Sequence, residues 1–278
     1  MALAEDLGSR GDLTSAMCLA GEDVSAKALV KTREAGRLSG VGFACQIFHL
    51  VDPELKISVA KQDGNAMQAG DVILEIAGSA ASLLAAERTA LNVVQQLSGV
   101  ATATSLCVDA VAGTGVKIFD TRKTVPGWRA AQKAAVVHGG GHNHRLGLYD
   151  QILLKENHFS AARDETAREM AERVLAQAPD GVQVIVEAST LEEAVSFADA
   201  GVDVILLDNF SDDELCEVVA VLNDHSRRGR FELEASGGVT LDSVRATAET
   251  GVDRISIGML THSAPAVDLS MSLESCDT

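Results

Sequence analysis

The sequence predicts an α/β protein in which a small α+β domain precedes an incomplete parallel α/β barrel. Two observations carry this prediction. From Val116 onward, short apolar runs alternate with amphipathic segments, which is typical of strands and helices that follow one another. The runs are rich in β-branched residues and apolar nearly throughout, as expected for parallel strands that are buried on both faces.

Six such runs are visible: VKIF, ILL, VQVIV, VDVILL, FELEA and RISI. The segments between them, such as TLEEAVSFADAG and TLDSVRATAETG, begin with Thr and end with Gly, which favours a capped helix. Because a complete barrel of this kind has about eight strands, six runs predict an incomplete one.

The first hundred residues have a different pattern. Two apolar stretches interrupted by glycine, LSGVGFACQIFHL and GDVILEIAG, precede an Ala- and Leu-rich segment that predicts a helix from about Ala80 to Leu97. We expect a first domain at residues 1–100 and a barrel at 101–263, and we assign the tail 264–278 as a candidate to pack on the first domain. The boundary rests only on the change of pattern near residues 99–113.

Composition excludes several classes of function. The chain has 278 residues, 46% of them hydrophobic, and a net charge of -17. Such an acidic surface repels nucleic acid and anionic lipid, so we expect neither as a partner. The five cysteines form no CxxC pair, which favours neither a disulfide framework nor a zinc site. Without a secretory leader or a run of about 18 apolar residues, we expect a cytoplasmic protein.

One stretch of this acidic chain is basic. Between Lys117 and Ser160 there are seven Lys and Arg residues against three Asp and Glu, together with four of the seven histidines. The candidate anion-binding residues are Arg122, Lys123, His144, Arg145 and Lys155. Arginine holds carboxylates and phosphates through paired hydrogen bonds, and lysine adds a compact charge. The stretch therefore predicts a substrate with several negative charges.

Polar residues or glycines follow every predicted strand. The carboxyl ends of barrel strands meet at one rim, so residues far apart in the chain become neighbours there. Glu187 and Asp208 end adjacent strands, and beside an anion site two carboxylates fit Mg²⁺. Ser236, Gly237 and Gly238 follow the run FELEA and allow backbone amides to approach a phosphate. The stretch SIGMLTHSA, which begins at Ser256 and contains Gly258 after the last strand, is expected to form the other wall.

The sequence HGGGHNHR, which begins at His138, has two further interpretations. An HGGG oxyanion loop requires a GxSxG nucleophile motif, and the chain has none. The H-x-H pair suits zinc, but no matching carboxylate or cysteine motif accompanies it. We therefore interpret the glycines as a loop that folds closely over a ligand.

Taken together, the motifs resemble the quinolinate phosphoribosyltransferase family. The stretches that carry the resemblance are EDLGSRGDLTS, AERTALN, DTRKTVPGWR, GGGHNHRLGLYD, LLKENH, VEAST, LLDNF, EASGGVT and SIGMLTHSA. They cover almost the whole chain, and the block from DTRKT to KENH is the most specific. The resemblance implies an N-terminal α/β sandwich, a barrel with fewer than eight strands, and transfer of phosphoribose to quinolinate with loss of CO₂ in NAD biosynthesis.

The resemblance also implies roles for individual residues. The family is dimeric, and Arg88 in AERTALN matches an arginine that enters the partner's active site. Arg122, His144 and Arg145 match residues that hold the two quinolinate carboxylates. The remaining matches are Lys123 and Lys155 between quinolinate and phosphoribosyl pyrophosphate, Glu187 and Asp208 at the ribose hydroxyls and Mg²⁺, and Ser236, Gly237, Gly238 and Gly258 at the ribose phosphate.

Three alternatives stay open at the level of the sequence. Lys155 at a strand end suits the Schiff-base lysine of a barrel aldolase. A divergent relative of the same fold could bind phosphate or another oxyanion without catalysis. A nicotinate phosphoribosyltransferase would use a similar site but release no CO₂.

Overall fold

The computed structural model describes residues 1–19, 24–162 and 165–275. The chain forms two compact units, and neither is a single continuous segment. The first contains Met1–Ser105 and Ala134–Gly140 together with residues 263–275, and the second contains Leu106–Lys133 and Gly141–His262.

The first unit is built on an antiparallel sheet in the order β12-β1-β5-β3. Its strands are β1 (Ser25–Thr32), β3 (Lys56–Val59), β5 (Val72–Ser79) and β12 (Leu269–Ser275). In β1 every second residue from Ala26 to Thr32 is buried, which is the pattern of a strand with one covered face. Strand β12, from the C-terminal tail, pairs with β1 along its length.

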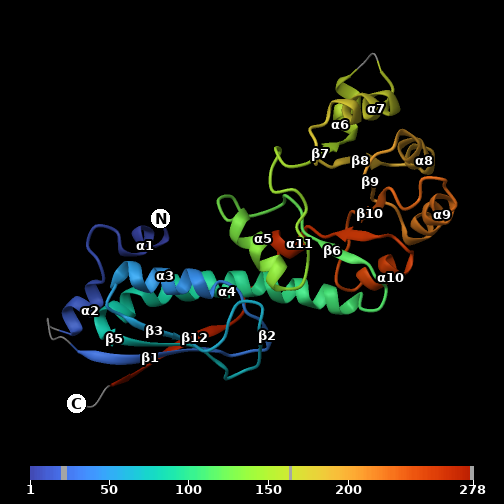
Figure 1. Ribbon diagram of the computed structural model, residues 1–278. Helices are drawn as coiled ribbons and strands as arrows, with labels where there is room; N and C mark the ends of the chain where they lie inside the picture. The colour runs from blue at the N-terminus through green and yellow to red at the C-terminus, as the bar shows by residue number, and fades with distance from the viewer. Residues whose placement is uncertain (20–23, 163–164, 276–278) are drawn as a thin grey trace. The chain divides into compact units, whose positions relative to one another are not determined.

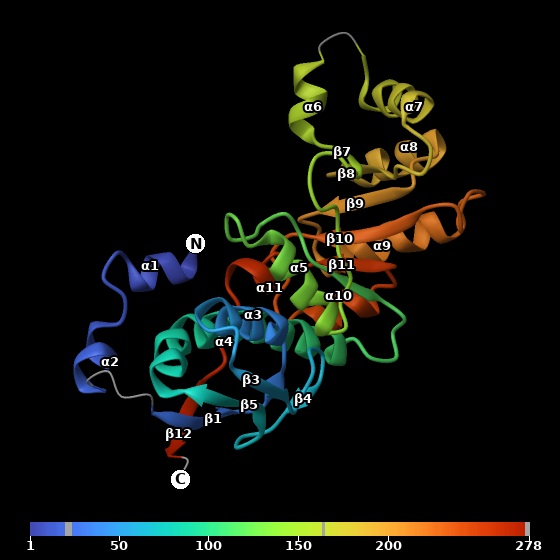
Figure 2. The same ribbon diagram turned by 60° about the vertical axis from the view of Figure 1, so that its left-hand side comes forward.

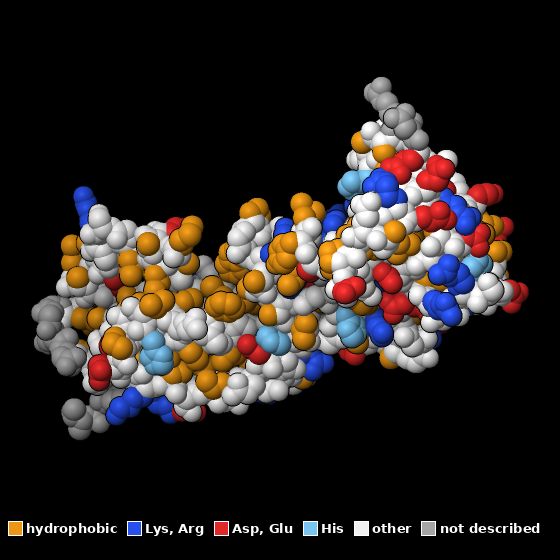
Figure 3. All heavy atoms as spheres, turned by 45° about the horizontal axis from the view of Figure 1, so that its top comes forward, with side chains coloured by type: hydrophobic (Ala, Val, Ile, Leu, Met, Phe, Trp, Pro, Cys, Tyr) orange, Lys and Arg blue, Asp and Glu red, His pale blue; other side chains and the backbone are white. Residues whose placement is uncertain are grey.

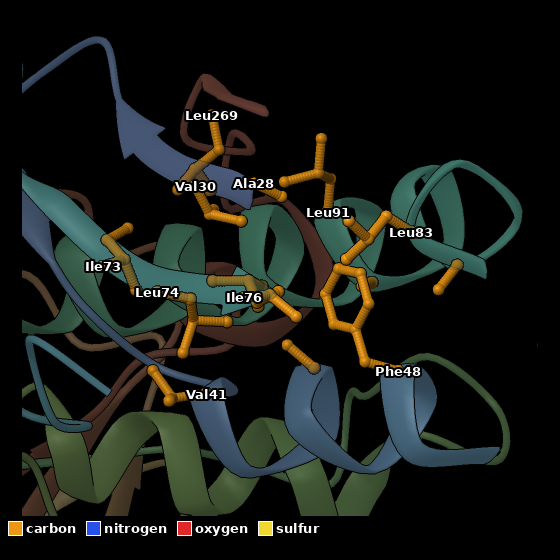
Figure 4. Packing of buried hydrophobic residues seen from close by; sticks show 14 of the residues in the cluster. Ala28, Val30, Val41, Phe48, Ile73, Leu74, Ile76, Leu83, Leu91 and Leu269 are labelled. Carbon is orange, nitrogen blue, oxygen red and sulfur yellow. The ribbon is translucent and has the colours of Figure 1, made fainter. Parts of the chain in front are cut away.

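Helices α3 (Val41–Val51) and α4 (Ala80–Ala110) lie on the same side of this sheet (Figure 1, Figure 2). Their apolar faces meet the sheet in one core, where Phe48 of α3, Leu83 of α4 and Ile76 of β5 converge (Figure 4). The smaller elements are α1 (Ala2–Leu7), α2 (Leu13–Cys18), β2 (Gly36–Arg37) and β4 (Ala66–Met67). The expected sandwich of helices on a sheet is confirmed.

Helix α4 differs from its prediction. The pattern predicts an end near Leu97, but the helix continues for 31 residues to Ala110. Gly99, at the domain boundary that the sequence pattern predicts, lies inside it. A Cβ atom at Gly99 would come within 2.1 Å of the Pro265 carbonyl oxygen. This glycine therefore permits a close approach of two chain segments, and it does not mark the end of a helix.

The second unit is built on a parallel sheet in the order β6-β11-β10-β9-β8-β7. Its strands are β6 (Lys117–Phe119), β7 (Ile152–Leu154), β8 (Val184–Ala188), β9 (Val204–Asp208), β10 (Glu232–Ser236) and β11 (Arg254–Ser256). Each lies on one of the six predicted runs. The last strand pairs with the first, and among the described residues only the pairing of β6 with β7 is missing. The predicted incomplete barrel is confirmed.

At least one helix follows each strand of this sheet along the chain. These helices are α5 (Arg129–His138), α6 (Glu156–Ala161), α7 (Ala167–Gln177), α8 (Leu191–Ala200), α9 (Asp212–Asn223), α10 (Val244–Glu249) and α11 (Met259–His262). Helix α8 packs on β8 and β9 between its neighbours α7 and α9 (Figure 1). As predicted, Thr190 caps its start and the left-handed Gly201 its end. The predicted cap at Thr240 is wrong, because α10 begins at Val244.

The surface carries both signs of charge despite the net charge of -17. On the face shown in Figure 3, acidic and basic side chains are interspersed. Many form ion pairs, such as Arg168 with Glu172 at 2.9 Å and Arg228 with Asp253 at 2.9 Å. No helix in the described part of the chain has both the length and the apolar character that a membrane crossing needs.

Candidate active site

A cavity of about 380 Å³ opens in the second unit at the carboxyl ends of the parallel strands. The structure brings together here most of the residues that the sequence singles out. The predicted residues that line the cavity are Arg122, Lys123, His144, Arg145, Lys155, Glu187, Asp208, Ser236, Gly237 and Gly238. Their convergence follows from the topology, because all six strands run in the same direction toward one rim.

Two predicted residues do not line this cavity. Gly258 lies close behind it, since a Cβ atom there would be 3.0 Å from Cδ of Lys123. Arg88 belongs to the first unit, where its side chain is 59% exposed and lies 4.0 Å from a carboxylate oxygen of Glu87. It borders a separate depression together with Arg33 and Asp268.

The cationic part of the cavity contains two arginines. The side chain of Arg145 is buried, and both its burial and the nearby charge of Arg122 lower the pKa of its guanidinium. The Nε atom of Arg122 is buried and makes no hydrogen bond within the described residues. Two neighbouring cations that are partly removed from water are costly unless an anion lies between them, so this part of the cavity is suited to a dicarboxylate.

The acidic part of the cavity is formed by Glu187 and Asp208. Burial raises the pKa of Glu187, the ion pair with Lys155 opposes this shift, and the charge of Asp208 adds to it. Nζ of Lys155 lies 3.0 Å from a Glu187 carboxylate oxygen. Among the described residues no group of three or more His, Cys, Asp or Glu could enclose a metal ion. Magnesium typically takes one or two protein carboxylates together with substrate phosphates, so this pair fits Mg²⁺.

The loop after β10 comes very close to the loop after β9. Gly237 has a φ of 107°, and a Cβ atom there would lie 2.3 Å from Oδ1 of Asn209. Asn209 itself has a φ of 60°, the only positive value for a non-glycine residue in the described part of the chain. Its side chain donates a hydrogen bond to Asp208 at 2.7 Å, and its backbone N–H donates to the Ser236 carbonyl at 2.8 Å. The carboxylate and the glycine loop are thus linked.

Buried ion pairs lie among the strands that carry the site. Nζ of Lys133 contacts the Asp120 carboxylate, and the His144 backbone N–H donates to the same carboxylate at 2.8 Å. Burial raises the pKa of Asp120 and lowers that of Lys133, and their ion pair opposes both shifts. On β10 and β11, Nε of Arg254 donates to Glu234 at 2.7 Å.

Sequence reasoning missed several residues of the cavity wall: Thr121, Leu153, Leu206, Asn209 and Glu234. The sequence carried a signal for one of them. Asn209 follows Asp208 directly after a strand, and asparagine is one of the few residues that adopt the left-handed conformation readily. Glu234 lies inside a predicted strand, where nothing in the sequence distinguishes a buried carboxylate from an outward-facing one.

Comparison with known proteins decides the family. Residues 12–98 match the family model for the N-terminal domain of quinolinate phosphoribosyl transferase, and residues 100–272 match that for its C-terminal domain. The chain belongs to the quinolinate phosphoribosyltransferase family. It is therefore an enzyme of the pentosyltransferase class.

Individual relatives agree with this assignment. The chain is 39% identical to the chloroplastic nicotinate-nucleotide pyrophosphorylase [carboxylating] of Oryza sativa subsp. japonica, over 99% of this chain and 76% of the relative. It is also 39% identical to the probable enzyme of that name from Bacillus subtilis, over 97% and 90%. Among solved structures, the nicotinate-nucleotide pyrophosphorylase of Francisella tularensis superposes with a TM-score of 0.89 at 37% identity, over 98% and 93%.

Proposed function

We propose that this chain transfers the phosphoribosyl group of phosphoribosyl pyrophosphate to quinolinate and releases CO₂, so that nicotinate mononucleotide and pyrophosphate form in NAD biosynthesis. The observation that supports this most is the presence of Arg122 and Arg145 in the same cavity as Glu187, Asp208 and the glycine loop. Quinolinate is a dicarboxylate and the other substrate a sugar polyphosphate. The cavity offers cations for the first and a backbone loop with paired carboxylates for the second.

In this proposal the arginines hold quinolinate. Arg122 and Arg145 pair with its carboxylates, which relieves the repulsion between two partly desolvated cations. Lys123 and Lys155 lie between the two substrates, and Lys155 exchanges its contact with Glu187 for a substrate oxygen. A pyridine nitrogen beside a carboxylate-bearing carbon is a weak nucleophile, so holding it in line with the ribose carbon is the main contribution of these residues.

Glu187 and Asp208 hold the ribose hydroxyls and Mg²⁺, and the backbone amides of Ser236–Gly238 receive the ribose phosphate. When bound, Mg²⁺ neutralises charge that grows on the departing pyrophosphate. Asn209 keeps the Asp208 carboxylate oriented through the 2.7 Å hydrogen bond. Gly258 leaves room for Lys123 beside this region.

The bonds change in two steps. The quinolinate nitrogen forms a bond to the ribose carbon, and the bond from that carbon to pyrophosphate breaks with its electron pair on pyrophosphate. The nitrogen is then cationic. The bond between the adjacent ring carbon and its carboxylate breaks next and CO₂ leaves. The electron pair stays on that carbon beside the cation, and it forms a C–H bond with a proton taken from water. The cation stabilises this pair, so the proposal requires no organic electron sink.

The test is an incubation with quinolinate, phosphoribosyl pyrophosphate and Mg²⁺ in which pyrophosphate and CO₂ are measured together. We expect equal amounts of both. Nicotinate in place of quinolinate should give neither, and pyrophosphate release with nicotinate would instead identify a nicotinate phosphoribosyltransferase. Binding of both substrates without turnover would identify a binding protein. Trapping of a carbonyl substrate on Lys155 by borohydride would favour the aldolase alternative.

The proposal includes a homodimer in which Arg88 completes the partner's cavity. The exposed Arg88 side chain, with its long contact to Glu87, supports this role. Arg88→Ala should be inactive alone, and so should a variant with a cavity mutation such as Lys155→Ala. Mixing the two after subunit exchange should restore part of the activity, because one hybrid site is then intact. No recovery after verified exchange would contradict a shared site.

We also propose a cytoplasmic location. The absence of a membrane-crossing helix in the described residues is compatible with it, but the Oryza sativa relative is named chloroplastic. Fractionation of cells that produce the full-length protein tests the proposal, and recovery of the chain in an organelle or membrane fraction would contradict it.

A further inference from the structure

Glu234 on β10 is a wholly buried carboxylate in the cavity wall. Neither the sequence prediction nor the proposed reaction uses it. One of its oxygens, Oε2, accepts a hydrogen bond from Nε of Arg254 at 2.7 Å. The other, Oε1, lies 3.5 Å from Nε2 of His144 and makes no hydrogen bond in the described part of the chain. Glu234 therefore lies between a fixed cation and a ring of the candidate site.

The ring of His144 is turned toward protein groups at both nitrogens. The backbone N–H of Arg145 donates to its Nδ1 at 2.8 Å. An acceptor nitrogen carries no proton, so this bond places the ring proton on Nε2, the atom that faces Glu234. The resemblance assigns His144 to the substrate carboxylates, but this geometry commits its two polar atoms to Arg145 and Glu234.

We infer that Glu234 and His144 are positioning residues for Arg145: Glu234 holds the imidazole through Nε2, and the imidazole holds the Arg145 backbone through Nδ1. The inference rests on the proposed function in one respect, that Arg145 binds the dicarboxylate. Arg145 itself is the group that touches the substrate. The buried Glu234 carboxylate acts on Arg145 only through the His144 ring.

The parallel strands explain why Glu234 can serve as this anchor. Glu234 and Arg254 are aligned partners in the register of β10 and β11. Arg254 also lies over the Phe119 ring, with its guanidinium carbon 4.8 Å from the ring centre. Burial alone raises the pKa of Glu234, but the His144 contact and the charge of Arg254 lower it overall. The carboxylate thus stays ionised without access to water.

A matched carboxylate on the same arginine provides a control. Glu232 contacts Nη1 of Arg254 at 3.0 Å, and its side chain is 38% exposed. Its other ion-pair contact is with Lys117 at 3.8 Å, and among the described residues it forms no ion pair with His144. Removing the charge of Glu232 therefore perturbs Arg254 while the contact between Glu234 and His144 remains.

The first experiment measures KM for each substrate. Glu234→Gln should raise KM for quinolinate about tenfold, because the carboxylate charge that faces Nε2 of His144 is lost, and leave KM for phosphoribosyl pyrophosphate unchanged. Glu232→Gln should change neither value, and Glu234→Asp, which keeps the charge, should recover part of the loss. An equal rise for both substrates, or the same rise in Glu232→Gln, would mean that Glu234 is merely structural.

A double-mutant cycle tests whether Glu234 acts through His144. His144→Gln should raise KM for quinolinate by a similar factor. Adding Glu234→Gln to it should then raise KM little further, because the ring that transmits the effect is gone. If the KM increases of the two single variants multiply in full in the double variant, the inference is overturned. If Glu234→Gln does not fold, the same cycle is measured with Glu234→Asp.

A spectroscopic measurement on the unaltered protein needs no variant. With ¹⁵N-labelled histidine, NMR should report His144 Nδ1 as an unprotonated nitrogen and Nε2 as a protonated one. A protonated Nδ1 would overturn the inference. This result is independent of the proposed function. If quinolinate is not turned over, the proposed function is wrong. The protonation of the two ring nitrogens still tests whether His144 contacts Glu234 through Nε2 and Arg145 through Nδ1.

Discussion

The two units differ in what they bury. In the first unit the described interior residues are apolar, apart from Ser and Thr side chains such as Ser39 and Ser98. Every buried Asp, Glu, Lys and Arg among the described residues lies in the second unit: Asp120, Lys133, Arg145, Glu234 and Arg254. Both units are packed around sheets, so the difference does not come from the type of secondary structure.

This contrast indicates what the charges are for. A buried ion pair contributes little net stability compared with apolar side chains of the same size, because both ions lose their hydration. The first unit contains no such pairs and has no candidate catalytic cavity among its described residues. In the second unit Glu234 lines the cavity, and Asp120 accepts a hydrogen bond from the backbone N–H of the lining residue His144. The buried ionised residues of this protein are therefore found next to its candidate active site.

The largest expected effect is on the free energy of unfolding and concerns the buried ion pair between Lys133 and Asp120 in the second unit. Lys133→Met should lower the free energy of unfolding by about 3–5 kcal/mol, because Asp120 is then buried without its counter-ion. Urea denaturation measures this value. Adding Asp120→Asn should recover part of it, and a loss of less than about 1 kcal/mol in the single variant would contradict the role of the pair.

The matched change in the first unit is Phe48→Ala. It should lower the free energy of unfolding by about 3–5 kcal/mol as well, because a large side chain leaves the apolar core. The two variants should differ in activity. Folded Phe48→Ala should keep the wild-type kcat, whereas Lys133→Met should also lose activity, since Lys133 holds the carbonyl of His144 at 2.8 Å.

The next largest effect is on catalysis. Arg122→Ala and Arg145→Ala should each lower kcat/KM by about 10² to 10³, because a substrate carboxylate is left without its partner at a cost of about 2–5 kcal/mol. Steady-state kinetics with quinolinate as the varied substrate measures the change. Wild-type kinetics in both variants would contradict their assignment to the dicarboxylate.

A smaller effect is expected at the glycine loop. Gly237→Ala should lower the free energy of unfolding by about 1–3 kcal/mol, because alanine is strained at positive φ and its Cβ atom would overlap Asn209. It should also raise KM for phosphoribosyl pyrophosphate. Gly229→Ala is the control, since Gly229 has a φ of 95° but nothing lies within 4 Å of its Cβ position. Equal KM values in the two variants would show that the close approach to Asn209 does not matter.

The smallest effect concerns pH. Burial raises the pKa of Glu187 above its ordinary value of 4.5. A proton therefore competes with Mg²⁺ at a pH where an exposed glutamate would already be ionised, and Mg²⁺ affinity should fall as the pH is lowered toward that range. Calorimetric titration of Mg²⁺ in the presence of phosphoribosyl pyrophosphate measures this. Glu187→Gln should remove this part of the pH dependence, and an unchanged profile would contradict the proposed contact.

Much of the second unit could be predicted from the sequence because its signals are local. A run such as VDVILL favours a buried strand whatever surrounds it, and the residue after a parallel strand must lie at the rim. The position of Asp208 and Lys155 in one cavity follows from these two facts. The first unit was harder, since Gly99 resembles a helix end until the segment near Pro265 is placed against it.

The chain sequence thus determines which segments become strands and helices and which charged residues stand at strand ends, because hydrophobic period and caps act over a few neighbouring residues. Only the folded chain decides that Glu234 faces Arg254 and His144. That pairing depends on the register of β10 against β11 and on a loop from another part of the chain. A shift of one residue would turn the same carboxylate to the other face of the sheet.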